Sequence, residues 1–178
     1  MHGLGLLHRW ALSACWLVHR GRLQALMKAV AALLAGNKLS VTHRERHLSG
    51  ATLRKHQIKC MDRLLGNGHL HRERIAIYRA MSQWLLPRTA LPVIVVDWSD
   101  CAPGRDWVLL RAAVPVRGRA IAIWEEVHPL SAYNSPGVHR DFLTRLAFVV
   151  PSTCRPILVT DAGFRWHPDR AHRSVIRV

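Results

Sequence analysis

Acidic residues are scarce in this chain of 178 residues, where 11 Asp and Glu stand against 26 Lys and Arg and the formal net charge is +15. The imbalance is greatest in the first half, because residues 1–90 hold 15 basic residues and three acids, a net charge of +12. Residues 91–178 hold 11 basic residues and eight acids, a net charge of +3. Such a charge predicts a polyanionic partner, nucleic acid first and an anionic membrane surface second.

The chain also lacks cysteine pairs with metal-binding spacing. No CxxC pair and no zinc-finger set of Cys and His occurs around the four cysteines, Cys15, Cys60, Cys101 and Cys154. Reduced thiols of a cytosolic protein are therefore expected. The apolar run Trp10–Val18 is far shorter than the roughly 20 residues that span a bilayer. Because Arg20 follows this run instead of preceding it, no export signal is expected either, and we predict a cytoplasmic protein. No membrane partner is expected, because the basic residues are spread over several predicted helices rather than one amphipathic face.

The first ninety residues favour helices, because they are rich in Leu, Ala and Met. Helices are predicted over Leu4–His19, Leu23–Leu34, Thr52–Leu65 and Arg72–Leu86. In the third, Lys55, Lys59 and Arg63 repeat every four residues and share one face. These three side chains are candidates for contact with DNA phosphates, although a solvated basic face fits the same spacing.

After Pro92 the pattern changes to strands. The run Val93–Val96 is continuously apolar, which is typical of a strand buried on both faces, and Ile157–Val159 is a second such run. Between them we predict an antiparallel hairpin of Trp107–Val116 and Arg119–Val127, followed by a helix over Asp141–Val150. That helix would return the chain to a strand parallel to the first, which gives an α/β domain with a mixed sheet.

Each of these two strands is expected to end on an aspartate, Asp97 in VIVVDWSD and Asp161 in PILVTDAGF. Active sites of α/β sheets gather at the carboxyl ends of strands. Two carboxylates placed there repel each other unless a divalent cation such as Mg²⁺ or Mn²⁺ lies between them. Spacing alone fits an aspartate that caps a turn equally well. Of the other polar residues, Glu125 and Glu126 are expected at a solvated strand end, and His128 and His139 at the surface or in caps.

Two sequence stretches carry a resemblance to a known family. VIVVDWSD, the strands after it and RPILVTDAGFR resemble the first part of the catalytic domain of bacterial insertion-sequence DDE transposases of the IS-four-like group. The upstream segment, especially KHxIKxxDRLLGN, is similar to the helical N-terminal region of the same group. The resemblance covers roughly residues 5–165.

The resemblance implies a ribonuclease H-like catalytic domain in which Asp97 is the first acid of the triad and Asp161 the second. It also implies Mg²⁺ or Mn²⁺ as cofactor, double-stranded transposon ends as partner, a homodimer in the full-length family and a place in the bacterial nucleoid. The expected organisation is a helical DNA-binding region over residues 1–90, a partial ribonuclease H-like domain over 91–165 and an unmatched basic tail over 166–178.

The family takes its third acid, a Glu, from a later helical region, and the residues after Arg165 do not resemble that region. We therefore expect a truncated transposase that binds DNA and is inactive in DNA nicking and strand transfer. A second interpretation is a non-catalytic DNA-binding fragment that competes for transposon ends. A third is a ribonuclease H-like nuclease that takes its third carboxylate from Glu125 or Glu126.

Overall fold

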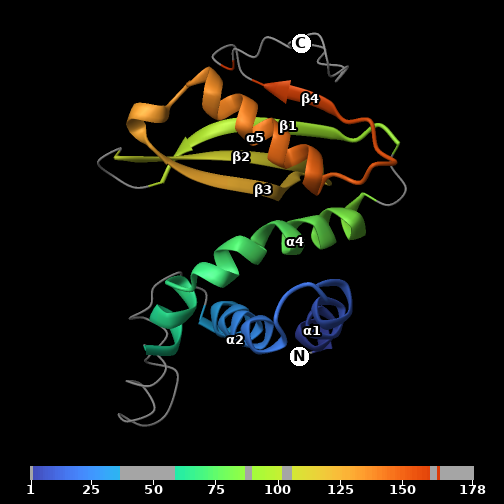
Figure 1. Cartoon of the computed structure of the whole chain (residues 1–178). Coiled ribbons are helices and arrows are strands. Elements are labelled where there is room, and N and C mark those ends of the chain that lie inside the picture. Colours follow the sequence, from blue (N-terminus) through green and yellow to red (C-terminus); the bar gives the residue numbers. More distant parts are fainter. Residues whose placement is uncertain (1, 37–58, 87–89, 102–105, 161–163, 165–178) are drawn as a thin grey trace. The chain divides into compact units, whose positions relative to one another are not determined.

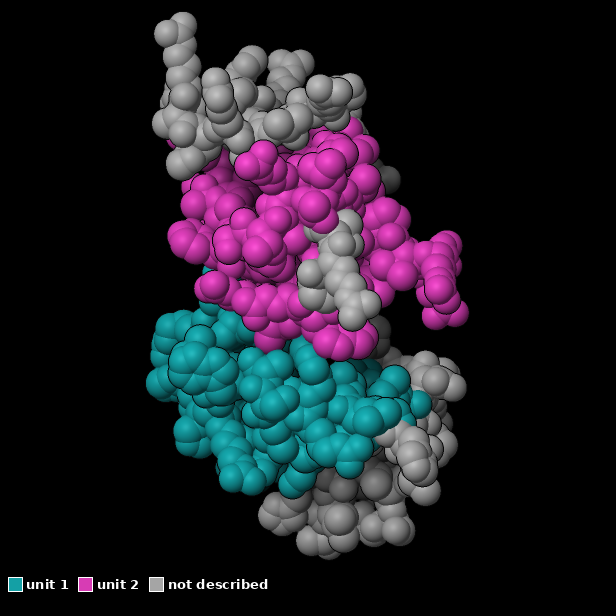
Figure 2. Space-filling model, turned by 90° about the vertical axis from the view of Figure 1, so that its right-hand side faces the viewer, with its two compact units in different colours: residues 1–77 teal, residues 78–178 magenta. Residues whose placement is uncertain are grey.

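The structure is a computed structural model that describes residues 2–36, 59–86, 90–101, 106–160 and 164. The chain divides into two compact units, residues 1–77 and residues 78–178 (Figure 2). The boundary falls within helix α4 (Gly68–Leu85), so each unit contains one part of that helix. The domain boundaries expected at residues 90 and 165 stay a prediction, and the tail over residues 166–178 lies outside the described residues.

The first unit is helical, as its composition predicts (Figure 1). Helix α1 (His2–Ala14) and helix α2 (Arg20–Gly36) are joined by a turn in which the amide of Val18 bonds to the carbonyl of Cys15 at 2.9 Å. Residues 59–65 are also helical, and the rest of the predicted helix lies outside the described residues. The buried side chains are small or aliphatic: Ala11, Cys15, Val18, Leu23, Met27, Ala29 and Leu64.

Helix α4 begins at Gly68, four residues before the predicted start at Arg72. Asn67 explains the earlier start, because its Oδ1 accepts the amides of His69 and Leu70, both at 3.0 Å. A side-chain oxygen before the first turn satisfies amides that have no partner within the helix. The Gly-Asn-Gly stretch that ends one helix therefore also starts the next.

Helices α2 and α4 are tied together within the first unit by an ion pair. Arg22 Nε donates to Glu73 Oε2 at 2.8 Å, and its Nη2 contacts the other carboxylate oxygen. The hydrogen bond from Arg22 lowers the pKa of Glu73 below its ordinary value. The ion pair thus fixes the first turn of α2 against α4.

The second unit contains a four-stranded mixed sheet with the order β3-β2-β1-β4 (Figure 1). Its strands and helix are β1 (Val93–Asp100), β2 (Trp107–Val116), β3 (Arg119–Pro129), α5 (Pro136–Val149) and β4 (Ile157–Thr160). Strand β2 is antiparallel to both β1 and β3, whereas β4 is parallel to β1. The predicted α/β mixed sheet, its hairpin and its parallel return are confirmed.

The hairpin turns at Arg117 and Gly118, whose φ angles are 45° and 76°. Two consecutive residues with positive φ match the twist of the flanking strands, and glycine takes this conformation without steric cost. Helix α5 begins at Pro136, five residues before its predicted start. Proline suits the first turn of a helix because its missing amide proton would have no partner there.

Helix α5 covers one face of the sheet. Strand β1 alternates accordingly: Ile94 and Val96 are fully buried, whereas Val93 and Val95 are each 39% exposed. The prediction that this run is buried on both faces is therefore wrong. A continuous Val/Ile run has the same sequence in a one-sided strand, because β-branched residues favour strands on either face.

Candidate functional site

Asp97 lies within β1, which continues for three more residues to Asp100. The expectation that the strand ends at Asp97 is wrong, because the residues beyond it still pair with β2, Ser99 with Leu109 among them. Asp97 is exposed, and its Oδ1 accepts the amide of Trp98 at 2.8 Å. The carboxylate therefore faces solvent from a rigid strand.

The two apolar runs are side by side, as predicted. In the parallel register Val95 pairs with Val159 and Val96 with Thr160, the last residue of β4. The next residue in each chain segment is an aspartate, Asp97 after Val96 and Asp161 after Thr160. Asp161 lies outside the described residues, so the pairing of the two acids stays a prediction.

Two of the three candidate DNA-binding residues are described. Lys59 and Arg63 are both exposed, and both belong to the helical stretch 59–65. A separation of four residues places them on the same face of this helix. Lys55 lies outside the described residues. Contact of all three with DNA stays a prediction.

A row of charged residues crosses the face of the sheet that carries Asp97. Asp97 pairs with Arg111 of β2, and Arg111 pairs with Glu125 of β3. Arg111 Nε donates to Glu125 Oε1 at 2.6 Å. The hydroxyl of Tyr78, from α4, donates to Glu125 Oε2 at 3.1 Å. Glu125 is therefore held by two partners and is not the solvated residue expected from the sequence.

Glu126 lies on the opposite face, under α5, and is only 4% exposed. Arg145 of α5 donates to both of its oxygens, at 2.5 and 2.9 Å, and Trp124 Nε1 donates at 2.8 Å. Burial raises the pKa of Glu126, but the hydrogen bonds from Arg145 and Trp124 outweigh burial and the pKa lies below its ordinary value. The expectation of a solvated Glu126 is wrong, because α5 supplies the arginine that makes its burial tolerable.

His139 is a second buried polar residue that the sequence did not reveal. It is fully buried in α5, its Nε2 accepts from Trp98 Nε1 at 3.0 Å, and its ring stacks on Phe164 with centroids 3.8 Å apart. Trp98 follows Asp97, and Phe164 follows Asp161 by three residues. His139 thus contacts both segments that carry the candidate acids, and the prediction of a surface histidine is wrong.

His128 was also expected at the surface, but it lies partly buried beside Glu126, with Nε2 at 3.2 Å from Oε2. Its ring packs edge-on against Trp98, with centroids 5.7 Å apart.

In the part of the chain that the structure describes, no group of three or more His, Cys, Asp or Glu could hold a metal ion. No described helix is long and apolar enough to cross a membrane.

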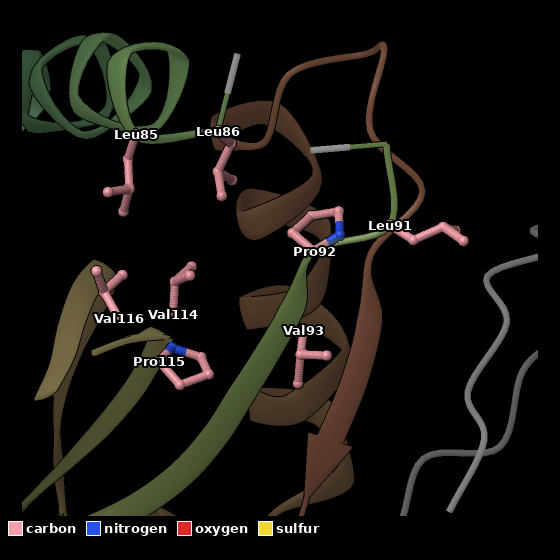
Figure 3. Close-up of a pocket in the computed structure, with 8 residues that line it drawn as sticks. All are labelled: Leu85, Leu86, Leu91, Pro92, Val93, Val114, Pro115 and Val116. Atoms are coloured by element: carbon pink, nitrogen blue, oxygen red, sulfur yellow. The ribbon is translucent and has the colours of Figure 1, made fainter. Parts of the chain in front are cut away.

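A pocket of about 310 Å³ lies at the other end of β1 (Figure 3). It is lined by Leu85, Leu86, Leu91, Pro92, Val93, Val114, Pro115 and Val116. These side chains provide neither charge nor hydroxyl, so the pocket offers no group for acid–base or metal chemistry. Asp97 lies four residues further along the strand than Val93, roughly 13 Å away at ~3.3 Å per residue. The pocket and the row of charged residues around Asp97 are therefore separate features.

Comparisons of the chain with models of protein families, with curated proteins and with solved structures find no match.

Proposed function

We propose that this protein binds double-stranded DNA as a relative of the insertion-sequence DDE transposases, with Asp97 and Asp161 as a carboxylate pair for a divalent cation. The observation that carries the proposal is the register of β1 and β4, in which Val96 lies beside Thr160 and an aspartate follows each of them. The antiparallel strands followed by a helical crossover support the finer assignment to a ribonuclease H-like domain.

Asp97 fits a cation ligand in its chemistry and exposure. Its carboxylate offers the hard oxygen donors that Mg²⁺ and Mn²⁺ prefer, and the amide of Trp98 occupies one of these oxygens from the side of the backbone. A cation bound by both aspartates would activate a water or 3′-hydroxyl and stabilise the oxygen that leaves a phosphodiester. The rigidity of β1, anchored through Trp98 to His139, would keep Asp97 aimed at this site.

The helical region supplies the proposed DNA contacts. The net charge of +12 over residues 1–90 attracts a polyanion, and the exposed pair Lys59 and Arg63, with Lys55, would contact phosphates from one helical face. Such a protein would act beside the nucleoid in the bacterial cytoplasm.

We further propose that this protein binds DNA without cutting it, because neither Glu125 nor Glu126 is free to join Asp97 and Asp161 as a third ligand. The family uses a third carboxylate to place a second ion, and Glu126 is a poor substitute because it faces α5 and is neutralised by Arg145. Glu125 faces the same side as Asp97 but is bonded to Arg111 and Tyr78. Because both glutamates already have hydrogen-bond partners, the second interpretation is favoured, a DNA-binding protein that occupies transposon ends without cleaving them.

The test is Mn²⁺ binding by titration calorimetry. The wild-type chain is expected to bind Mn²⁺ weakly, and both Asp97→Asn and Asp161→Asn should abolish this binding. Asp106→Asn removes an exposed acid of the same unit and should leave binding unchanged. Mn²⁺ binding that survives in both aspartate variants would refute the carboxylate pair, and failure to retard duplex DNA in a gel would refute the DNA-binding role.

A further inference from the structure

Arg111 lies between two carboxylates, one on each neighbouring strand. The register places it opposite Asp97 of β1 and opposite Glu125 of β3. Residues directly opposite each other have Cβ atoms roughly 4.5–5.5 Å apart, and the long arginine stem lets the guanidinium reach either neighbour. Arg111 therefore has a choice of partner.

The structure shows which partner Arg111 takes. Its Nε bonds to Glu125 Oε1 at 2.6 Å, while the second oxygen of Glu125 accepts from Tyr78 at 3.1 Å. None of the described side chains forms an ion pair with Asp97, whose Oδ1 accepts the amide of Trp98. Glu125 thus binds the arginine that would otherwise be the nearest counter-ion of Asp97.

We propose that Glu125, held in place by Tyr78, is a positioning residue that keeps Arg111 away from Asp97 and so leaves the Asp97 carboxylate open to a divalent cation. This inference rests on the proposed cation site. An arginine paired with Asp97 would compete with the cation for the same oxygens, because a carboxylate oxygen that accepts a guanidinium proton offers fewer lone pairs to a metal. Glu125 need not touch the cation to affect its binding.

Removal of the Glu125 charge should release Arg111 to Asp97. An exposed ion pair contributes up to ~1 kcal/mol, so Mn²⁺ binding to Glu125→Gln should weaken by about fivefold. The double variant Glu125→Gln/Arg111→Gln lacks the competing arginine and should bind Mn²⁺ as the wild type does. Asp106→Asn removes the same amount of negative charge at a site outside the row and should have little effect, which separates partner exchange from loss of net charge.

A second measurement follows the arginine directly and needs no metal. The NMR signal of Arg111 Nε–Hε reports which acceptor that group has. In the wild type, Asp97→Asn should leave this signal in place, whereas in the Glu125→Gln background the same substitution should shift it. Circular dichroism and thermal unfolding of each variant check that the sheet is intact.

The outcomes separate the two ideas. If the wild type does not bind Mn²⁺ through Asp97, the cation site fails, and the NMR comparison still decides whether Glu125 controls Arg111. If Asp97→Asn leaves the Arg111 signal unchanged in the Glu125→Gln background, the positioning role is overturned. It is equally overturned if Glu125→Gln binds Mn²⁺ as tightly as the wild type, or if the double variant stays as weak as the single one.

Discussion

Replacement of Glu126 by glutamine should destabilise the protein more than the neutralisation of any other acid in the described part of the sheet. Glu126 is 4% exposed and joins β3 to α5 through the bidentate contact with Arg145. Glutamine keeps the shape and can still accept from Trp124 Nε1. The substitution therefore removes the charge of the pair with little change in packing.

The size of this destabilisation depends on the charge of Arg145, which the substitution leaves without its partner. Removal of one partner from a buried ion pair costs about 3–5 kcal/mol, because the other charge stays buried without compensation. Here the side chain of Arg145 is 40% exposed and can regain contact with water. We therefore expect the free energy of unfolding to fall by roughly 2–3 kcal/mol, less than the full cost because water solvates the Arg145 guanidinium. At roughly 2–4 °C per kcal/mol for a chain of this size, the melting temperature should fall by about 4–12 °C.

The loss should depend on pH in a defined direction. Because the folded-state pKa of Glu126 lies below its ordinary value of 4.5, the ionised pair stabilises the fold above that value. This stabilisation disappears as the pH falls through the folded-state pKa. The difference in unfolding free energy between wild type and Glu126→Gln should be constant near neutral pH and shrink below about pH 4.5.

The assay is urea unfolding at several pH values, followed by circular dichroism and Trp fluorescence. Asp106→Asn serves as the control, since its exposed carboxylate should contribute less than about 0.5 kcal/mol. Equal unfolding free energies for wild type and Glu126→Gln at pH 7 would contradict the reasoning. So would a difference that persists undiminished at pH 3, because it would not come from the ionised pair.

Three further outcomes are expected. Replacement of Lys55, Lys59 and Arg63 by glutamine should weaken duplex binding and lower the slope of log affinity against log salt by roughly two to three, about one per lost phosphate contact; an unchanged slope in binding titrations would argue for a merely solvated face. His139→Ala should cost about 2–4 kcal/mol in urea unfolding, since it removes a fully buried ring and a hydrogen-bond acceptor; a cost below 1 kcal/mol would mean that the stack is unimportant. Purified chain should not nick supercoiled plasmid with Mn²⁺, and nicking that disappears in Asp97→Ala would show that two carboxylates suffice.

The strand pattern could be predicted from the sequence because it depends on short-range signals. Two short apolar runs predicted the parallel pair β1 and β4, and Arg117-Gly118 between two apolar stretches predicted the hairpin turn. The start of α5 was missed because Pro136-Gly137 also resembles a turn. Proline at the first position of a helix and proline in a loop have the same sequence, and only the tertiary context distinguishes them.

The buried polar groups could not be predicted, because each depends on a partner far away in the sequence. Glu126 and Arg145 are 19 residues apart, and Trp98 and His139 are 41 apart. Neither pair has a characteristic spacing, since the contact arises only when α5 crosses the sheet. Tyr78 of α4 and Glu125 are 47 residues apart and likewise have no characteristic spacing. From the sequence alone, such residues can be placed only by their residue type, and charged types such as Glu and Arg are mostly found at the surface.

The alternation along β3 decides how the acids of this sheet can be used. Neighbouring residues of a strand point to opposite faces, so Glu125 shares a face with Asp97 while Glu126 faces α5. Glu126 carries its own counter-ion and stabilises the fold, which leaves it no role beside Asp97. Glu125 lies two strands away, too far to share a cation at the ~4.8 Å spacing of strands, but next to the arginine that could neutralise Asp97. Two adjacent glutamates that look equivalent in the sequence therefore have different tasks, one in holding α5 to the sheet and one in controlling the charge around the candidate site.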